Sequence, residues 1–176
     1  MACSQTINGL VRDCASSMGG IVEVLLANYD EVKTVTVDEG RITAIEMYDG
    51  GFFKPYHFRR NTSSMTSTYN IDPANGVNYV STELVMLFSR MDATKRLEMT
   101  ALALNELVAL VKDANGKWWY LGYDEPLAAS AGDGQTGTAR SDGNRYSITL
   151  QDNSTELPME VDSDIIAGLM VDTTAA

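Results

Sequence analysis

The chain has 176 residues with 13 basic and 24 acidic side chains, a formal net charge of −11 and a pI near 4.4. This charge argues against a protein that wraps nucleic acid, because lysine and arginine are needed to hold the phosphate backbone. Hydrophobic residues make up 44% and charged residues 21%, which is typical of a folded domain, and the length favours a single one. No apolar run approaches the about 20 residues of a membrane helix, so no membrane partner is expected.

The first 20 residues are rich in Ser, Asn, Gly and Cys and predict an irregular N-terminal arm. They lack the apolar stretch of a secretory signal. Cys3 and Cys14 both lie in this arm, and their spacing matches no zinc signature. We expect two reduced thiols in a protein made in a cytoplasm, with a disulfide clip between them as the alternative.

Short β patterns follow the arm. Residues 21–27 form a mostly apolar run that predicts a buried strand, and residues 32–37 and 41–47 flank a tight turn at Asp38-Glu39-Gly40. Residues 52–60 predict an extended aromatic segment, in which His57 is expected on the strand surface rather than at a catalytic site.

The most informative segment is a long β-hairpin over residues 62–90, with its turn at residues 72–76. Pairing Asp72 with Val77 places Thr68 opposite Ser81, so that the polar positions of the two strands coincide and the apolar positions do too. The hairpin therefore has one apolar face, with Met65, Tyr69, Val80 and Leu84. Its other face is rich in hydroxyl groups and faintly acidic, and comprises Thr62, Ser64, Thr66, Thr68, Ser81 and Glu83.

A helix is predicted over residues 92–104, with Asp92 as its N-cap and Asn105 at its end. Its apolar period places Ala93, Leu97, Ala101 and Leu104 on one face, which would cover one side of a sheet. Residues 107–111 and 117–123 predict two strands joined by a turn at residues 113–116. Residues 128–144 predict a mobile Gly-rich loop with room for one short strand, and residues 146–150 and 157–161 predict two more strands.

These elements predict a mainly β protein, an antiparallel β-sandwich or barrel with one flanking α-helix. The expected organisation is an N-terminal arm over residues 1–20, a single β-sandwich domain over residues 21–165, and a frayed C-terminal tail over residues 166–176.

No sequence motif predicts catalysis, a cofactor or a metal. The Gly-rich stretch at residues 132–137 contains an acid and no lysine, so it predicts a flexible loop rather than a phosphate cradle. Asp133, Asp142 and Asn144 lack the oxygen spacing of a calcium loop. A glycosidase-like pair of carboxylates stays open, because sequence alone gives no separation between scattered acids.

Two clusters are candidates for contacts between subunits. Phe58, Arg59 and Arg60 form a small basic patch that suits an acidic neighbouring subunit. In the run of Trp118, Trp119 and Tyr120, alternation sends one ring to the core and one to a rim, where Trp119 is expected at an interface. A sugar-stacking platform is the alternative interpretation of these rings.

The order of elements resembles that of the tail tube (major tail) protein family of tailed bacteriophages, of the type found in phages of Bacteroidetes hosts. The resemblance covers residues 15–165 and is carried by the hairpin NTSSMTSTYNIDPANGVNYVSTELVMLFSR, the helix DATKRLEMTALAL, and the strands KDANGKWWYLGYD and RYSITLQD. It implies stacked, usually hexameric rings in a virion tail, assembled in the host cytoplasm, without enzymatic activity. It also implies contacts with other copies and with tail or neck proteins, and DNA as a passing cargo.

Under this resemblance the hydroxyl-rich face becomes the lining of a DNA channel. Hydroxyl and carboxylate groups stay hydrated or repel phosphate, whereas cations would bind it. Without the resemblance, the same face is the solvent side of an ordinary antiparallel sheet. A capsid decoration or neck connector protein and a carbohydrate-binding β-sandwich module are the alternative functions.

Overall fold

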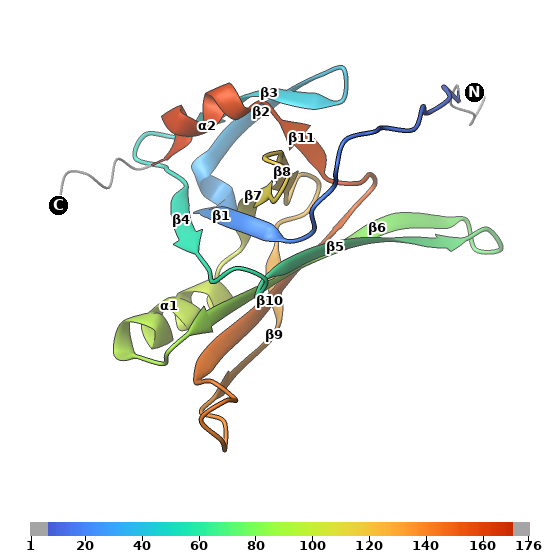
Figure 1. Ribbon diagram of the computed structural model, residues 1–176. Helices are drawn as coiled ribbons and strands as arrows, with labels where there is room; N and C mark the ends of the chain where they lie inside the picture. Colours follow the sequence, from blue (N-terminus) through green and yellow to red (C-terminus); the bar gives the residue numbers. More distant parts are fainter. Residues whose placement is uncertain (1–6, 171–176) are drawn as a thin grey trace.

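Two β-sheets form the body of the protein in the computed structural model, which describes residues 7–170 (Figure 1). The larger sheet has the strand order β2-β3-β11-β8-β7-β1-β4, and the smaller one has the order β5-β6-β10-β9. Every neighbouring pair is antiparallel except β3 and β11, which run parallel. The predicted mainly β sandwich with a flanking helix is confirmed.

The strands of the larger sheet are β1 (Ile21–Asn28), β2 (Val32–Asp38), β3 (Arg41–Met47), β4 (Lys54–His57), β7 (Leu107–Asp113), β8 (Trp118–Leu121) and β11 (Met159–Val161). Those of the smaller sheet are β5 (Ser64–Asp72), β6 (Val77–Ser89), β9 (Ala128–Gln135) and β10 (Arg145–Ser154). The helices are α1 (Ala93–Leu104), α2 (Ser163–Leu169) and a single 3-10 turn at Tyr29–Glu31.

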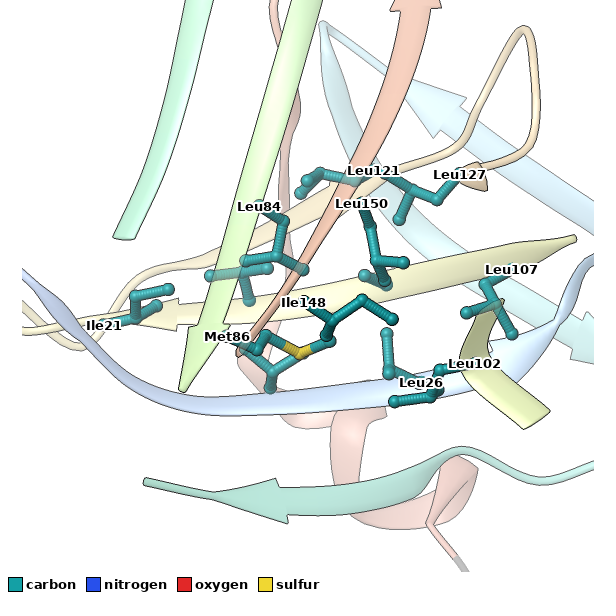
Figure 2. Close-up of a cluster of buried hydrophobic side chains, with 13 residues drawn as sticks. Ile21, Leu26, Leu84, Met86, Leu102, Leu107, Leu121, Leu127, Ile148 and Leu150 are labelled. Atoms are coloured by element: carbon teal, nitrogen blue, oxygen red, sulfur yellow. The ribbon is translucent and has the colours of Figure 1, made fainter. Parts of the chain in front are cut away.

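The central strands β1 and β7 are buried on both faces, which explains their nearly continuous apolar sequences. Val24 and Leu26 of β1 face a core between the two sheets, and Leu25 faces a second core on the other side of the larger sheet. Figure 2 shows the first core, a cluster that contains Leu26 of β1, Leu84 and Met86 of β6, and Ile148 and Leu150 of β10.

The predicted turns are confirmed, and their residues explain their geometry. Glu39 and Gly40 have φ values of 49° and 78°, the left-handed conformation that a two-residue hairpin turn needs. In the long hairpin, the side-chain amide of Asn75 donates a 2.6 Å hydrogen bond to Asp72 Oδ2, and the Ala74 amide donates to Asp72 Oδ1 at 3.1 Å. These bonds hold the loop that sets the strand register.

Helix α1 begins and ends as predicted, but the prediction of which helix face contacts the sheet is wrong. The Asp92 carboxylate caps it by accepting a 2.8 Å hydrogen bond from the Lys95 amide. Leu97 and Leu104 are 62% and 79% exposed, whereas Leu102 is 3% exposed in the core. The Lys95 ammonium donates to the Ser89 and Arg90 carbonyls at 3.1 and 2.9 Å. That anchor turns the side with Lys95 and Leu102 toward the body.

The segment expected to be a mobile loop with room for one short strand contains an eight-residue strand, β9. Its small residues pair along β10, and a Cβ atom at Gly134 would lie 2.8 Å from Cε1 of the Tyr146 ring. The ring therefore covers the backbone that glycine leaves open. The sequence pattern left room for a strand but did not give the place and length of β9, because small residues give no apolar alternation.

The domain boundary expected at residue 165 is also wrong. Ile166 and Leu169 of α2 are 4% and 7% exposed in the second core, so the folded body includes residues expected in the tail. The rest of that tail, residues 171–176, and Cys3 lie outside the described residues, whereas Cys14 is exposed with a free thiol. Within residues 7–170, no helix has the length and apolar character to cross a bilayer.

The two faces of α1 give a direct stability prediction. Leu102→Ala should lower the free energy of unfolding by about 2–4 kcal/mol, because it leaves a cavity in the core. Leu97→Ala, on the exposed face of the same helix, should change it by less than about 0.5 kcal/mol. Urea denaturation followed by circular dichroism measures both, and equal losses would contradict the helix orientation.

Candidate functional site

The strand register predicted for the long hairpin is the register of the structure. Thr66 lies opposite Glu83, Thr68 opposite Ser81, and Met65 opposite Leu84. Because side chains alternate along a strand, this register collects the hydroxyl groups on one face and sends the apolar groups to the core.

The polar face of the hairpin is turned away from the core. Ser64, Thr66, Thr68 and Glu83 are exposed, and Ser81 is half-buried. Thr62 differs from the prediction, because it precedes β5 and its hydroxyl donates a 2.7 Å hydrogen bond to the Arg59 carbonyl. Five of the six predicted residues therefore share one exposed face, and Thr62 belongs to the turn before it.

The polar face continues onto β10, where sequence reasoning had not placed it. Gln151 pairs with Glu83, and its side-chain amide donates a 2.8 Å hydrogen bond to Ser81 Oγ. Asn153 lies opposite Ser81, and Thr149 lies opposite Val85. The alternation of Ser147, Thr149 and Gln151 with apolar residues was visible in the sequence. What the sequence lacked was the pairing of β10 with β6, which joins segments far apart in the chain.

The charges on this face are few. Glu83 and Asp133 supply carboxylates, and the hydroxyl of Ser147 donates to Asp133 across β10 and β9. Arg145, at the start of β10, is the one cation among the outward-facing residues of these four strands. It pairs with Ser89 of β6 and Gln135 of β9. Val85 and Leu87 of β6 are half-buried and lie on the same face as Glu83. The resulting surface, which we call the polar sheet face, consists largely of hydroxyl and amide groups with a slight excess of negative charge.

The opposite side of the same strands contains a buried polar row. Ser67, Thr82 and Asp152 pair across β5, β6 and β10, and the Ser67 and Thr82 hydroxyls lie 3.0 Å apart. Asp152 is 5% exposed, and its Oδ2 accepts a 2.7 Å hydrogen bond from the Gly122 amide just beyond β8. This bond ties the smaller sheet to the larger one. Asp152 Oδ1 is buried and has no hydrogen-bond partner among residues 7–170.

Burial and the nearby Asp124 carboxylate raise the pKa of Asp152, and the hydrogen bond from the Gly122 amide partly opposes them. A cavity of about 280 Å³ adjoins this carboxylate and is lined in addition by Tyr120, Tyr123 and Asp124. Among residues 7–170 no cluster of three or more His, Cys, Asp or Glu side chains is arranged to hold a metal ion.

The predicted interface residues occupy different places. The Phe58 ring lies 5.4 Å from the Phe88 ring and contacts the inter-sheet core, so the fold itself uses much of its surface. Arg59 and Arg60 are exposed, and neither forms an ion pair with any residue that the structure describes. Their role at an interface stays a prediction.

Trp118 and Trp119 divide between the two faces of β8, as alternation predicts. Trp118 is 6% exposed in the second core. Trp119 is half-buried against the inter-sheet core, and its indole N–H donates a 3.1 Å hydrogen bond to Asp113 Oδ2. The remaining surface of Trp119 lines a groove beneath the hairpin, together with Tyr69.

Exposed apolar side chains gather on the elements that project from the body (Figure 1). At the free end of the hairpin, Tyr69 and Ile71 are 51% and 64% exposed. The outer side of α1 presents Leu97 and Leu104, described above. Such surfaces are typical of contacts with another protein.

No family model matches the chain, and no curated protein or solved structure matches it at a significant level.

The raised pKa of Asp152 predicts a specific pH dependence of stability. A raised pKa means that the folded state binds the proton more tightly than the unfolded state, whose value lies near 3.8. Stability is therefore lost as the pH rises from that value through the folded-state pKa. Asp152→Asn removes this titration and still offers an oxygen to the Gly122 amide.

The variant should therefore gain in stability relative to the wild type as the pH rises above about 4, measured as unfolding free energies in urea. Asp133→Asn, at an exposed carboxylate, is the control and should show a smaller gain. A pH-independent difference between Asp152→Asn and the wild type would contradict the assignment.

Proposed function

We propose that this protein is a structural subunit of a virion, a tail tube protein whose copies form stacked rings around a DNA-conducting channel. The observation that carries the proposal is the polar sheet face, which runs across all four strands of one sheet and ends at two strands with a free edge. The virion tail as its location and the absence of enzymatic activity are part of the proposal.

The edges of the smaller sheet support closure between copies. In the described part of the chain, β5 pairs only with β6 and β9 pairs only with β10. Exposed edges favour pairing with another chain, and a closed barrel removes them. If β5 of one copy pairs with β9 of the next, six copies, the ring size that the family resemblance implies, would give a barrel of 24 strands. Such a barrel would measure about 45–50 Å between opposite backbones, enough for a DNA duplex to pass.

The chemistry of the polar sheet face suits a surface that DNA slides past. Hydroxyl and amide groups of Thr66, Thr68 and Gln151 are satisfied by water and make only weak contacts with phosphate. Glu83 and Asp133 repel phosphate, and Arg145 is the one cation on the strands' outward rows. A lining rich in cations would instead hold DNA by counterion release.

The projecting apolar surfaces support the assembly side of the proposal. Tyr69 and Ile71 at the hairpin and Leu97 and Leu104 on α1 lie outside both cores of the isolated chain. Apolar area of this kind gains free energy when a neighbouring subunit covers it. In a stack, the hairpin and the helix are suited to reach adjacent copies.

Electron microscopy of the concentrated protein tests the assembly. The expected result is rings or tubes with a central bore. A particle that stays monomeric and without a bore under all conditions would reject the proposal, and labelling that places the protein on the capsid shell or at the neck would replace it with a decoration or connector role.

A charge change on the polar sheet face tests the channel. Ser64→Lys combined with Thr66→Lys should leave folding and ring formation intact but lower infectivity more than about tenfold, because lysines retard the passing DNA. The matched control is Ser64→Gln with Thr66→Gln, which adds similar bulk without charge and should keep infectivity near wild type. Unchanged infectivity of assembled lysine particles would exclude this face from the channel.

A further inference from the structure

Within the N-terminal arm, residues 7–11 carry three large aliphatic side chains that stay in water in the described part of the chain. Ile7, Leu10 and Val11 are 95%, 100% and 95% exposed. The arm runs away from the body as an extended segment (Figure 1). Three large aliphatic side chains within five residues are unfavourable in water, so the segment is suited to a partner surface.

A groove on the body presents apolar side chains among polar ones. It has a volume of about 840 Å³ and lies between the projecting hairpin and the connection from β10 to β11. Tyr69, Trp119, Leu157 and Met159 contribute to its lining, and Leu157 is 45% exposed. Ile71, 64% exposed, lies on the same face of β5 as Tyr69 and extends this apolar surface toward the hairpin tip.

We propose that the N-terminal arm of one copy docks in this groove of a second copy. The inference deepens the proposed function, because it rests on self-assembly and names one contact that would link the copies. The apolar side chains of the arm would cover Tyr69 and Leu157, which the isolated chain leaves in water.

The distribution of charge allows the arm to reach a second copy. Each chain carries a net charge of −11, so two copies repel one another. Residues 7–20 contain only Arg12 and Asp13 as charged side chains and are neutral as a segment. The arm can therefore approach the acidic body without adding to the repulsion. Arg12 follows Val11 directly and is suited to pair with Glu156, which lines the groove.

The attachment of the arm to its own body supports docking on another one. The Met18 amide donates to Asn115 Oδ1 at 2.9 Å, and the Asn115 side-chain amide donates to the Met18 carbonyl at 3.0 Å. The Ala114 amide also donates to the Gly20 carbonyl at 3.0 Å. These bonds fix the base of the arm at the turn between β7 and β8. From there the arm leads away from the body (Figure 1), and residues 7–20 contribute nothing to the lining of the groove in their own chain.

Cross-linking between two versions of the full chain tests the docking. The first version carries Cys3→Ser and keeps Cys14 as its only thiol, at an exposed position in the arm. The second carries Cys3→Ser, Cys14→Ser and Asn78→Cys, which places a thiol on the lining of the groove. His57→Cys in place of Asn78→Cys is the matched control, because His57 is exposed on the edge strand β4 and lies outside the groove lining.

On mixing and mild oxidation, the Asn78→Cys version should form the mixed disulfide at least about tenfold faster than the His57→Cys version, as effective concentration predicts. Ile7→Asn, Leu10→Asn and Val11→Asn together, placed in the first version, should remove this preference. Their side chains are almost fully exposed, so the thermal stability of the monomer should not change.

Equal rates for the two thiol positions, or a preference that survives the triple arm variant, would overturn the inference. A disulfide that forms within one chain carrying both Cys14 and Asn78→Cys, at a rate independent of concentration, would show the arm in its own groove and would also overturn it. Electron microscopy separates this outcome from the proposed function. Arm-dependent cross-links without rings would reject the tube and leave the docking, whereas rings from the protein with its native arm, together with equal cross-linking rates at the two thiol positions, would reject the docking and leave the tube.

Discussion

The register of the β5–β6–β10 ladder is the constraint on which the rest of the structure depends. A shift by one residue would move Leu84 and Met86 of β6 into water and bring Glu83 into the core. The loop that Asp72 and Asn75 hold sets this register at one end of the hairpin. The register that places apolar side chains in the inter-sheet core therefore also places polar side chains on the polar sheet face. The two faces use different residues of the same strands.

The sequence predicted the elements whose signal is local. The turn at residues 72–76 and the alternation of Thr66 and Thr68 with apolar neighbours were enough for the hairpin and its pairing. Features set by distant contacts were not predictable in this way. The orientation of α1 depends on Lys95 reaching two carbonyls before the helix, the parallel pairing of β11 with β3 joins distant segments, and β9 is held by β10 rather than by its own composition. The candidate site shows the same division, since its β5–β6 half was predictable and its β10 half was not.

The protein combines two properties that oppose each other in solution. A net charge of −11 keeps copies apart, while the hairpin, α1 and the arm carry apolar side chains that the monomer does not cover. Assembly through these elements would bury apolar area at points of low charge and leave carboxylates such as Glu83 in water. The polar sheet face, which is in contact with bulk water in one copy, would then line an enclosed aqueous channel in a ring. The hydroxyl, amide and carboxylate groups of that face would determine how the channel interacts with DNA.

A cryo-electron microscopy map of the assembled protein, at a resolution that shows side chains, tests this account most directly. The account predicts that Thr66, Glu83 and Gln151 point into a central bore and that β5 of each copy pairs with β9 of its neighbour. A map in which these three side chains lie against another protein surface or on the outside of the assembly would contradict it.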